Sequence, residues 1–255
     1  MNISGATRVY CLLGDPLHKA RTPEHFNGLF AQRGIDAVMV PLEVPDGALA
    51  EAFSVLRKVK NLDGLIITMP HKAGMAGLVD ELEAGGRNAG AINAARRGGD
   101  GRWRGDMFDG RGYTGALAAR GVDPRGKQIH LIGAGAVARA IGFALREAGA
   151  GAFTLVDVNR SRAAALAGLL EARVADEPEK ADVVVNCTPL GMKEGDALPC
   201  DPARISPAAV VSDVTTKPEI TPFLSAARAR GHTVTTGRDM FEAQGELIAG
   251  FFGWR

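Results

Sequence analysis

Short apolar runs alternate with amphipathic stretches along most of the chain. The runs RVYCLLG, AVMVPLEV and LDGLIITMP are each followed by a stretch with more mixed polarity, in most cases with the apolar spacing of a helix. Brief apolar runs rich in β-branched residues are typical of buried strands, and their alternation with helices is typical of βαβ units. The pattern therefore predicts an α/β protein built on mainly parallel sheets.

Two of the predicted helices carry recognisable sequence signals. For the first helix, Thr22 can act as a cap, Pro23 suits the first turn, and Gly34 can take the left-handed conformation that ends helices. The last segment, FEAQGELIAGFFGW, predicts an amphipathic terminal helix. Its inward-facing residues are expected to be Phe241, Leu247, Ile248 and Phe251.

The pattern changes after residue 91, and this change predicts a second domain. Two short segments flank the turn at residues 98–101, which reads as a hairpin closing the first unit. A strand, turn, helix and strand then follow in the order of a dinucleotide-binding unit. We expect one domain over residues 1–108 and another over residues 109–237.

Composition and charge exclude several classes of protein. With 255 residues, 46% of them hydrophobic, the chain can bury a large core, and its net charge of +1 gives no reason to expect nucleic acid or an anionic membrane as a partner. Cys11, Cys187 and Cys200 lack disulfide or metal-ligand spacing, so we expect reduced thiols and no metal. The chain shows neither a secretory signal nor an apolar run of ~20 residues, which predicts a soluble cytoplasmic protein.

A glycine-rich loop is the clearest chemical motif. Gly133, Gly135 and Ala138 form G-x-G-x-x-A directly after the apolar strand predicted at 128–132, and they open the helix predicted at 136–147. Glycines let the backbone approach a pyrophosphate, and the helix N-terminus supplies unpaired N–H groups. This context favours dinucleotide binding over the alternative of a purely structural tight turn.

An acidic residue ends the next predicted strand and bears on which dinucleotide binds. Asp157 lies 24 positions after Gly133, near the offset at which a carboxylate accepts hydrogen bonds from the adenosine ribose. Because its charge would repel a 2′-phosphate, we expect NAD to be preferred, with NADP possible. Asp157 could instead be a solvated strand end or a helix cap, and Arg160 or Arg162 could reach a 2′-phosphate.

Several polar residues follow predicted strands of the first domain. They are Thr22, Thr68, Lys72, Asn93 and Asp109. Ligands in open α/β sheets gather at the carboxyl ends of strands, so these side chains could converge, and a lysine with a carboxylate partner is a plausible proton-transfer pair. Taken singly, each has a structural alternative: a helix cap for Thr22 or Asp109, a solvated cation for Lys72, and a turn residue for Asn93.

Seven motifs in order give the chain a resemblance to one enzyme family. They are GDPLHKARTP, TMPHK, AGAIN, GDMFDG, GAGAVAR, NCTPLGM and MFEAQ. In this order and over nearly the whole chain, they resemble the shikimate/quinate dehydrogenase family. The resemblance implies a substrate domain, a Rossmann domain, and a terminal helix at 238–255 that packs back on the first domain. It also implies hydride transfer between a nicotinamide and a ring carbon, in aromatic amino acid biosynthesis. We expect the protein to be a monomer or homodimer.

The resemblance also implies a role for each matching residue. Lys72 matches the catalytic lysine and Asp109 its partner aspartate, which places a cationic proton donor beside the reacting oxygen. The residues matching substrate contacts are Thr22, Thr68, Asn93 and Gln244. The expected cofactor contacts are Gly133, Gly135, Ala136, Ala138, Asp157, Asn159, Arg160, Thr188 and Gly237.

The chain departs from the family pattern where the substrate is expected. The departures fall at Ala20, Thr22, Ile66, Met107, Phe108 and Thr216. Because polar contacts are lost there, we expect the substrate to be a cyclic hydroxy-acid whose carboxylate is bound less tightly than that of shikimate in typical family members. Lys19 or Arg21 could compensate by binding the carboxylate as a cation. Two other classes remain open: a methylenetetrahydrofolate dehydrogenase-like enzyme, and a nucleotide-sensing protein without turnover.

Overall fold

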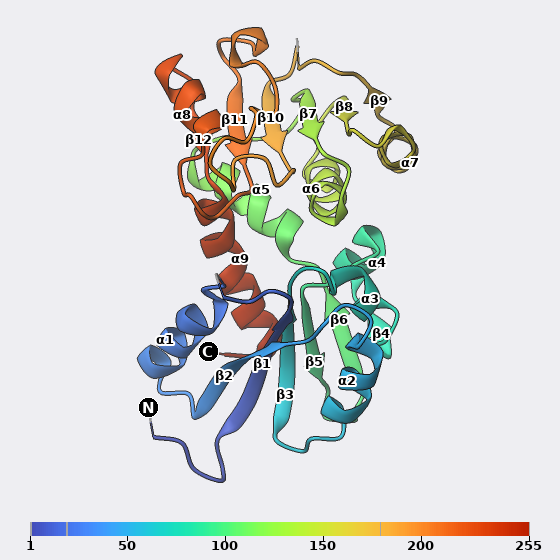
Figure 1. The fold of residues 1–255 in the computed structure, drawn as a ribbon, viewed down its shortest axis with the longest axis vertical. Coiled ribbons are helices and arrows are strands. Elements are labelled where there is room, and N and C mark those ends of the chain that lie inside the picture. The colour runs from blue at the N-terminus through green and yellow to red at the C-terminus, as the bar shows by residue number, and fades with distance from the viewer. Residues whose placement is uncertain (1, 19, 179, 255) are drawn as a thin grey trace. The chain divides into compact units, whose positions relative to one another are not determined.

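The protein folds into two compact α/β units. The structure is a computed structural model that describes residues 2–18, 20–178 and 180–254. One unit comprises Met1–Phe108 together with Glu246–Arg255, and the other comprises Asp109–Gly245. Each contains a sheet of mainly parallel strands with helices against it (Figure 1). This confirms the α/β fold class predicted from the apolar pattern.

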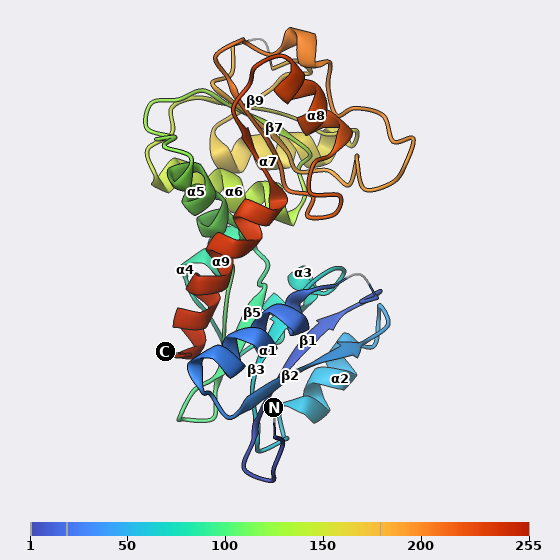
Figure 2. The ribbon, with the colours of Figure 1, turned by 90° about the vertical axis from the view of Figure 1, so that its left-hand side faces the viewer.

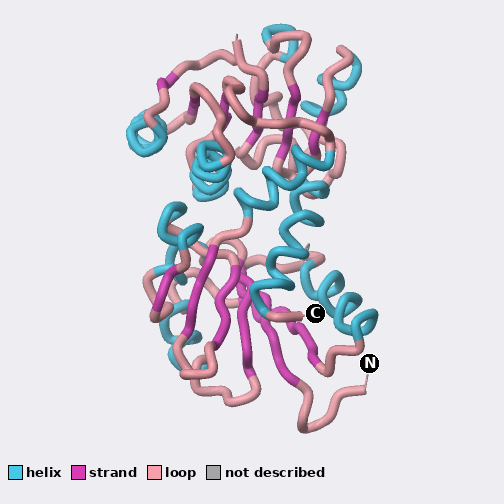
Figure 3. Tube along the Cα trace, turned by 180° about the vertical axis from the view of Figure 1, so that it is seen from behind, coloured by secondary structure: helices cyan, strands magenta, loops and turns pink. Residues whose placement is uncertain are grey.

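The sheet of the first unit combines parallel strands with one hairpin. Its strands lie in the order β2-β1-β3-β5-β6-β4, side by side in Figure 3. They are β1 (Arg8–Gly14), β2 (Ala37–Glu43), β3 (Leu62–Ile67), β4 (Glu81–Leu82), β5 (Ala94–Arg97) and β6 (Trp103–Asp106). β1 pairs in parallel with β2 and β3, whereas β5 and β6 pair antiparallel across the turn at 98–101. The predicted hairpin is therefore confirmed.

Alternation along β1 divides the first unit into two layers. Tyr10 and Leu12 point to one face, where they pack with α1 (Thr22–Arg33), and Cys11 and Leu13 point to the other. That second face is covered by α2 (Leu49–Leu56), and Figure 1 shows α1 and α2 on opposite sides of the sheet. Two short helices, α3 (Lys72–Ala76) and α4 (Ala84–Ala89), complete the unit.

The start of α1 differs from the sequence prediction, while its end agrees with it. Arg21 occupies the N-cap position without a side-chain cap, and Thr22 is already the first helical residue. The reason is that Arg21 has helical backbone angles and its carbonyl already accepts a hydrogen bond from His25 N at 2.9 Å. The prediction of Thr22 as a cap was wrong. Gly34 ends the helix with φ 65°, as predicted.

The sheet of the second unit is parallel throughout the described strands. Its order is β12-β11-β10-β7-β8-β9. The strands are β7 (Ile129–Ile132), β8 (Phe153–Val156), β9 (Arg173–Val174), β10 (Val183–Asn186), β11 (Val210–Asp213) and β12 (Val234–Thr235). Because all the pairs are parallel, the carboxyl ends of these strands lie along one edge.

Helices cover both faces of this second sheet. One face packs against α5 (Asp109–Ala119), α6 (Ala136–Glu147) and α7 (Arg160–Leu170). The other face packs against α8 (Pro222–Ala229), which the 3₁₀ turn η1 (Pro202–Arg204) contacts, and Figure 2 shows α8 away from α5 and α6. This is the doubly covered parallel sheet expected of a dinucleotide-binding unit.

The terminal helix α9 (Gly237–Phe252) begins in the second unit and ends in the first. A reciprocal cap starts it, since Thr236 N donates to Asp239 Oδ2 at 2.8 Å and Asp239 N donates to Thr236 Oγ1 at 3.1 Å. At its other end Ile248 and Trp254 are buried in the aromatic cluster of the first unit. Leu247 is 37% exposed, so its predicted inward orientation was wrong. No described helix is long and apolar enough to cross a membrane.

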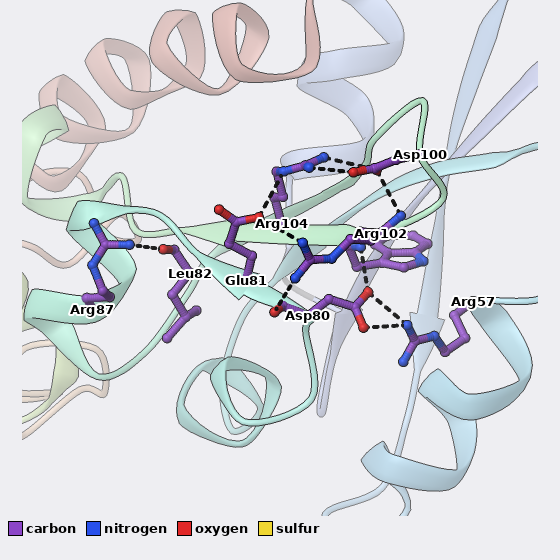
Figure 4. A network of polar contacts seen from close by, with 9 residues as sticks. Arg57, Asp80, Glu81, Leu82, Arg87, Asp100, Arg102 and Arg104 are labelled. Carbon is purple, nitrogen blue, oxygen red and sulfur yellow. Dashed lines mark hydrogen bonds and ion pairs between the residues drawn. The ribbon is translucent and has the colours of Figure 1, made fainter.

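An ion-pair network surrounds the hairpin of the first unit (Figure 4). Asp80 accepts from Trp103 N at 2.7 Å and from Arg57 Nη2 at 2.8 Å, and these two donors hold the pKa of Asp80 below its usual range. Arg104 pairs with Asp100 at 2.6 Å, which lowers the pKa of Asp100 to about 2. The network ties the start of β6 to Asp80 and Glu81, and through Asp80 to Arg57 at the end of α2.

Candidate active site

The loops that follow β1 and β3 lie against each other at the carboxyl edge of the first sheet. Asp15 N donates to Met69 O at 3.0 Å, and Thr68 N donates to Leu13 O at 2.8 Å. Gly14 makes this approach possible, because a Cβ there would overlap the side chain of Thr68 and lie 2.7 Å from Leu17 Cδ2. Thr68 is thus held beside the loop that leads to Thr22.

Lys72 begins α3 just beyond the end of β3. Its carbonyl accepts from Ile92 N at 2.9 Å, and Asn93 O in turn accepts from Ile67 N at 2.9 Å. These bonds fasten the end of β3 and the start of α3 to the segment that leads into β5. The structure therefore brings Thr68, Lys72 and Asn93 together at one edge of the sheet, where the Lys72 side chain is half-buried.

Two buried polar side chains fix the segment that leads to Asp109. Asn93 Oδ1 accepts from Phe108 N at 2.9 Å. Asp106 Oδ1 accepts from Gly86 N and from Met107 N, both at 2.9 Å. The positioning role of Asp106 was missed in the sequence, although the family-like GDMFDG motif contains it.

The departures at Ile66 and Phe108 turn out to be core residues. Ile66 is 6% exposed and packs in the same apolar cluster as Phe26 and Phe108. The ring of Phe108 lies 5.3 Å from that of Phe251. An amide at position 66 would therefore have to be accommodated beside apolar side chains.

Of the two cations expected to compensate for these departures, the structure describes Arg21 but not Lys19. Arg21 Nε and Nη2 donate to the carboxylate of Glu24 at 2.8 Å and 2.5 Å, so a substrate carboxylate would have to compete with Glu24 for Arg21. Lys19 lies outside the described residues. Thr216 lies on the exposed loop after β11.

Asp109 and Gln244 belong to the second unit, on α5 and α9. Asp109 is 2% exposed. One turn later, α5 packs closely against α9, because a Cβ at Gly112 would lie 2.6 Å from Gln244 Cβ. The pairing of Asp109 with Lys72, and a shared substrate site with Gln244, remain predictions.

The glycine loop has the form that a pyrophosphate requires. Gly133 has φ 99°, and a Cβ there would lie 3.0 Å from Thr188 Cγ2 and 3.2 Å from Cys187 C. Gly135 is the N-cap of α6, and the position of its Cβ is open space. Ala136 begins the helix, and Ala138 is fully buried beneath it. Open backbone at the N-terminus of a helix fits an anionic dinucleotide.

Asp157 braces this loop from the end of β8. Its Oδ2 accepts from Ala134 N and its Oδ1 from Asn159 N, both at 2.8 Å. Asn159, and not Asp157, caps α7, accepting from Arg162 N at 3.0 Å. The alternative of Asp157 as a helix cap was therefore wrong. Each oxygen of an ionised carboxylate has a further lone pair, so Asp157 can still accept from a ribose.

A buried carboxylate organises the loops after β10 and β11. Asp213 Oδ2 accepts from Asn186 Nδ2 at 3.0 Å and Thr221 Oγ1 at 2.8 Å, and its Oδ1 accepts from Thr215 N at 2.9 Å. Asn186 Oδ1 accepts from both the N and the Oγ1 of Thr188, at 3.0 Å and 2.6 Å. Burial raises the pKa of the Asp213 carboxyl. Sequence reasoning missed Asp213, and its position at a strand end was the only signal.

Gly237 has a steric role beside these loops. A Cβ at this position would overlap the backbone carbonyl of Thr215. The glycine therefore allows the start of α9 to approach the loop after β11. Gly133, Asp157, Thr188 and Gly237 all follow strands of the second sheet, so the structure gathers these predicted cofactor contacts along its carboxyl edge.

Comparisons with known proteins agree with this arrangement. Residues 12–95 match the family model described as the shikimate dehydrogenase substrate binding domain. The chain is 34% identical over 255 aligned positions to shikimate dehydrogenase (NADP(+)) of Rubrobacter xylanophilus, covering 95% of this chain and 89% of that protein.

Two solved structures are similar over almost the whole chain. Shikimate 5-dehydrogenase of Listeria monocytogenes, in complex with shikimate and NAD, has a TM-score of 0.91 at 27% identity, covering 100% of this chain and 94% of that one. Ligand-free 5-ketofructose reductase of a Gluconobacter strain has a TM-score of 0.88 at 26% identity, covering 98% and 94%. The resemblance found in the seven motifs is thus confirmed, and the chain belongs to the shikimate/quinate dehydrogenase family, oxidoreductases of a CH–OH group.

Proposed function

We propose that this protein interconverts a ring hydroxyl and a ring ketone of shikimate, quinate or a related cyclic hydroxy-acid, using a nicotinamide dinucleotide. The observation that carries the proposal is the half-buried Lys72, bonded through its backbone to the segment that leads into β5 beside Thr68 and Asn93. A methylenetetrahydrofolate dehydrogenase-like activity or a sensor without turnover has no comparable support.

The proposed chemistry gives the dinucleotide, Lys72 and Asp109 one task each. A dinucleotide bound to the protein would supply or accept the hydride at the ring carbon. In the direction of ketone reduction, the Lys72 ammonium stabilises the charge that develops on the carbonyl oxygen and donates a proton to it. In the direction of oxidation, neutral Lys72 takes the hydroxyl proton back. The proposed task of Asp109 is to orient the lysine.

The substrate contacts that we propose are hydrogen bonds from Thr22, Thr68, Asn93 and Gln244. Ala20 and Ile66 remove polar partners, and each lost hydrogen bond to a charged group is worth about 1.5–3 kcal/mol. We therefore expect shikimate to have a weak KM. Restoring the missing hydroxyl with Ala20→Ser should lower that KM, and an unchanged KM would show that position 20 does not meet the substrate.

A second candidate substrate class is a polyhydroxy ketone without a carboxylate. It is favoured by Ala20, since the hydroxyl missing there is one that the family resemblance assigns to the substrate carboxylate. The similar structure named as a 5-ketofructose reductase has the same two-unit fold. Initial rates on shikimate, quinate and uncharged keto-sugars distinguish the two classes. Turnover of the keto-sugars alone would overturn the hydroxy-acid assignment.

For the cofactor, we propose that both NAD and NADP bind along the carboxyl edge of the second sheet. The NAD preference expected from Asp157 lacks support from the curated relative, which is named for NADP(+), while a similar structure holds NAD. Arg160 and Arg162 are the proposed partners of a 2′-phosphate. Dissociation constants for the two dinucleotides test this, and failure of either one to bind would contradict it.

A further inference from the structure

An ion pair sits beside the proposed adenosine end of the cofactor site. Arg160, the first residue of α7, donates from Nη1 to Asp176 Oδ1 at 2.7 Å and from Nη2 to Asp176 Oδ2 at 3.2 Å. The pair is bidentate, so both guanidinium nitrogens on this side face the carboxylate. Both side chains are largely exposed, at 64% and 61%.

The sheet register explains why Asp176 reaches this place. Leu155 of β8 is in register with Val174 of β9, and Ala175 N donates to Leu155 O at 3.0 Å. Asp157 and Asp176 each follow the last register pair by two residues on adjacent parallel strands. Two carboxylates therefore stand at neighbouring strand ends, one bracing the glycine loop and the other holding Arg160.

We propose that Asp176 is a specificity-determining residue that weakens the preference for cofactors with a 2′-phosphate by occupying Arg160. The inference rests on the proposed binding of a dinucleotide at the glycine loop. A phosphate would engage the same guanidinium nitrogens that Asp176 now holds. The phosphate must therefore break the ion pair of Arg160 with Asp176 and then lie near the negative charges of Asp157 and Asp176. An unphosphorylated ribose hydroxyl neither breaks the pair nor is repelled by these charges.

The size of the effect follows from the exposure of the pair. Exposed ion pairs contribute little because water and salt screen them, and removing Asp176 also removes one like charge near the phosphate. Together these terms give about three- to tenfold tighter binding of a 2′-phosphorylated nucleotide in Asp176→Asn. A nucleotide without that phosphate should bind as before.

Calorimetric titration with adenosine 2′,5′-bisphosphate and with 5′-AMP tests the proposal without any turnover. In Asp176→Asn we expect the bisphosphate to bind about three- to tenfold more tightly and 5′-AMP to be unchanged. A matched control is Asp123→Asn, which removes another exposed aspartate paired with an arginine, Arg125, in the segment before β7. It should change neither constant.

A second variant tests whether Arg160 carries the effect. In an Arg160→Ala background, Asp176→Asn should lose most of its gain, because no guanidinium is left to release. If Asp176→Asn left the ratio of the two dissociation constants unchanged, for example by tightening both nucleotides equally, the role of Asp176 would be overturned while the proposed cofactor site would stand. If the unaltered protein bound neither nucleotide, the proposed cofactor site itself would fail, and this assignment with it.

Discussion

Replacing Asp213 with alanine should destabilise the second unit strongly, because this carboxylate holds two loops from inside the fold. Asp213 is 2% exposed and accepts hydrogen bonds from Asn186, Thr215 and Thr221. The Asn186 amide keeps a second bond, to Leu190 O at 3.1 Å. The full penalty therefore falls on two donors, the Thr215 amide and the Thr221 hydroxyl.

The expected magnitude follows from those two donors. A buried donor left without a partner costs about 1–3 kcal/mol, so two of them cost about 2–6 kcal/mol, and the small cavity adds to this loss. Domains of this size have about 5–15 kcal/mol of stability in total, so the loss should be plain in denaturant unfolding followed by circular dichroism. Loosening the loop that carries Thr188 should also weaken binding of either dinucleotide about tenfold, equivalent to about 1.4 kcal/mol.

A carboxylate in the same loop region serves as the control. Asp196 Oδ2 accepts from Gly191 N at 2.9 Å and Lys193 N at 3.0 Å, but it is only half-buried. Asp196→Ala should cost about 1 kcal/mol or less, since water can replace its bonds. Equal losses for Asp196→Ala and Asp213→Ala, or a loss below about 1 kcal/mol for Asp213→Ala, would refute the reasoning.

Two further predictions concern the first unit. Trp254→Ala should lower the free energy of unfolding by about 3–5 kcal/mol, because Trp254 is 3% exposed and packs against four aromatic rings, those of Tyr10, Phe26, Phe30 and Phe252. The control Leu247→Ala, on the exposed side of α9, should lower it by less than about 1 kcal/mol. The native protein should be more stable to unfolding than Asp80→Asn, and urea titrations repeated from pH 7 to pH 2 measure the difference. That difference should be full above pH ~4, the pKa of an unfolded aspartate, and should vanish as the pH falls through the lowered pKa of folded Asp80. A difference independent of pH would contradict the role of that charge.

Most of the architecture could be predicted from the sequence, because it depends on local patterns of apolar and polar residues. The alternation of apolar runs predicted the parallel sheets, and the helix predicted at 136–147 is found at Ala136–Glu147. Gly133 and Gly135 also behave as their spacing indicates, one by its positive φ and the other by the open space above it. These features follow from backbone geometry within one βαβ unit.

What escaped prediction depends on contacts distant in sequence. No local sequence pattern indicates that Asp213 accepts a hydrogen bond from Asn186, 27 positions earlier, or that Arg160 forms an ion pair with Asp176. Leu247 had the spacing of an inward residue, but Ile248 and Trp254 occupy the buried face. Thr22 had the residue type of a cap, yet the backbone of Arg21 enters the helix first. Tertiary packing overrides local preference in each case.

The most direct test of the account is the turnover number of Lys72→Ala with the best substrate and dinucleotide, followed by nicotinamide absorbance. The proposed role of Lys72 in proton transfer predicts a loss of about 10²–10⁴-fold in kcat, with dinucleotide dissociation constants nearly unchanged. Lys58→Ala, at an exposed lysine of the same unit, should keep the native kcat. A near-native kcat in Lys72→Ala would contradict the central claim that this lysine carries the chemistry.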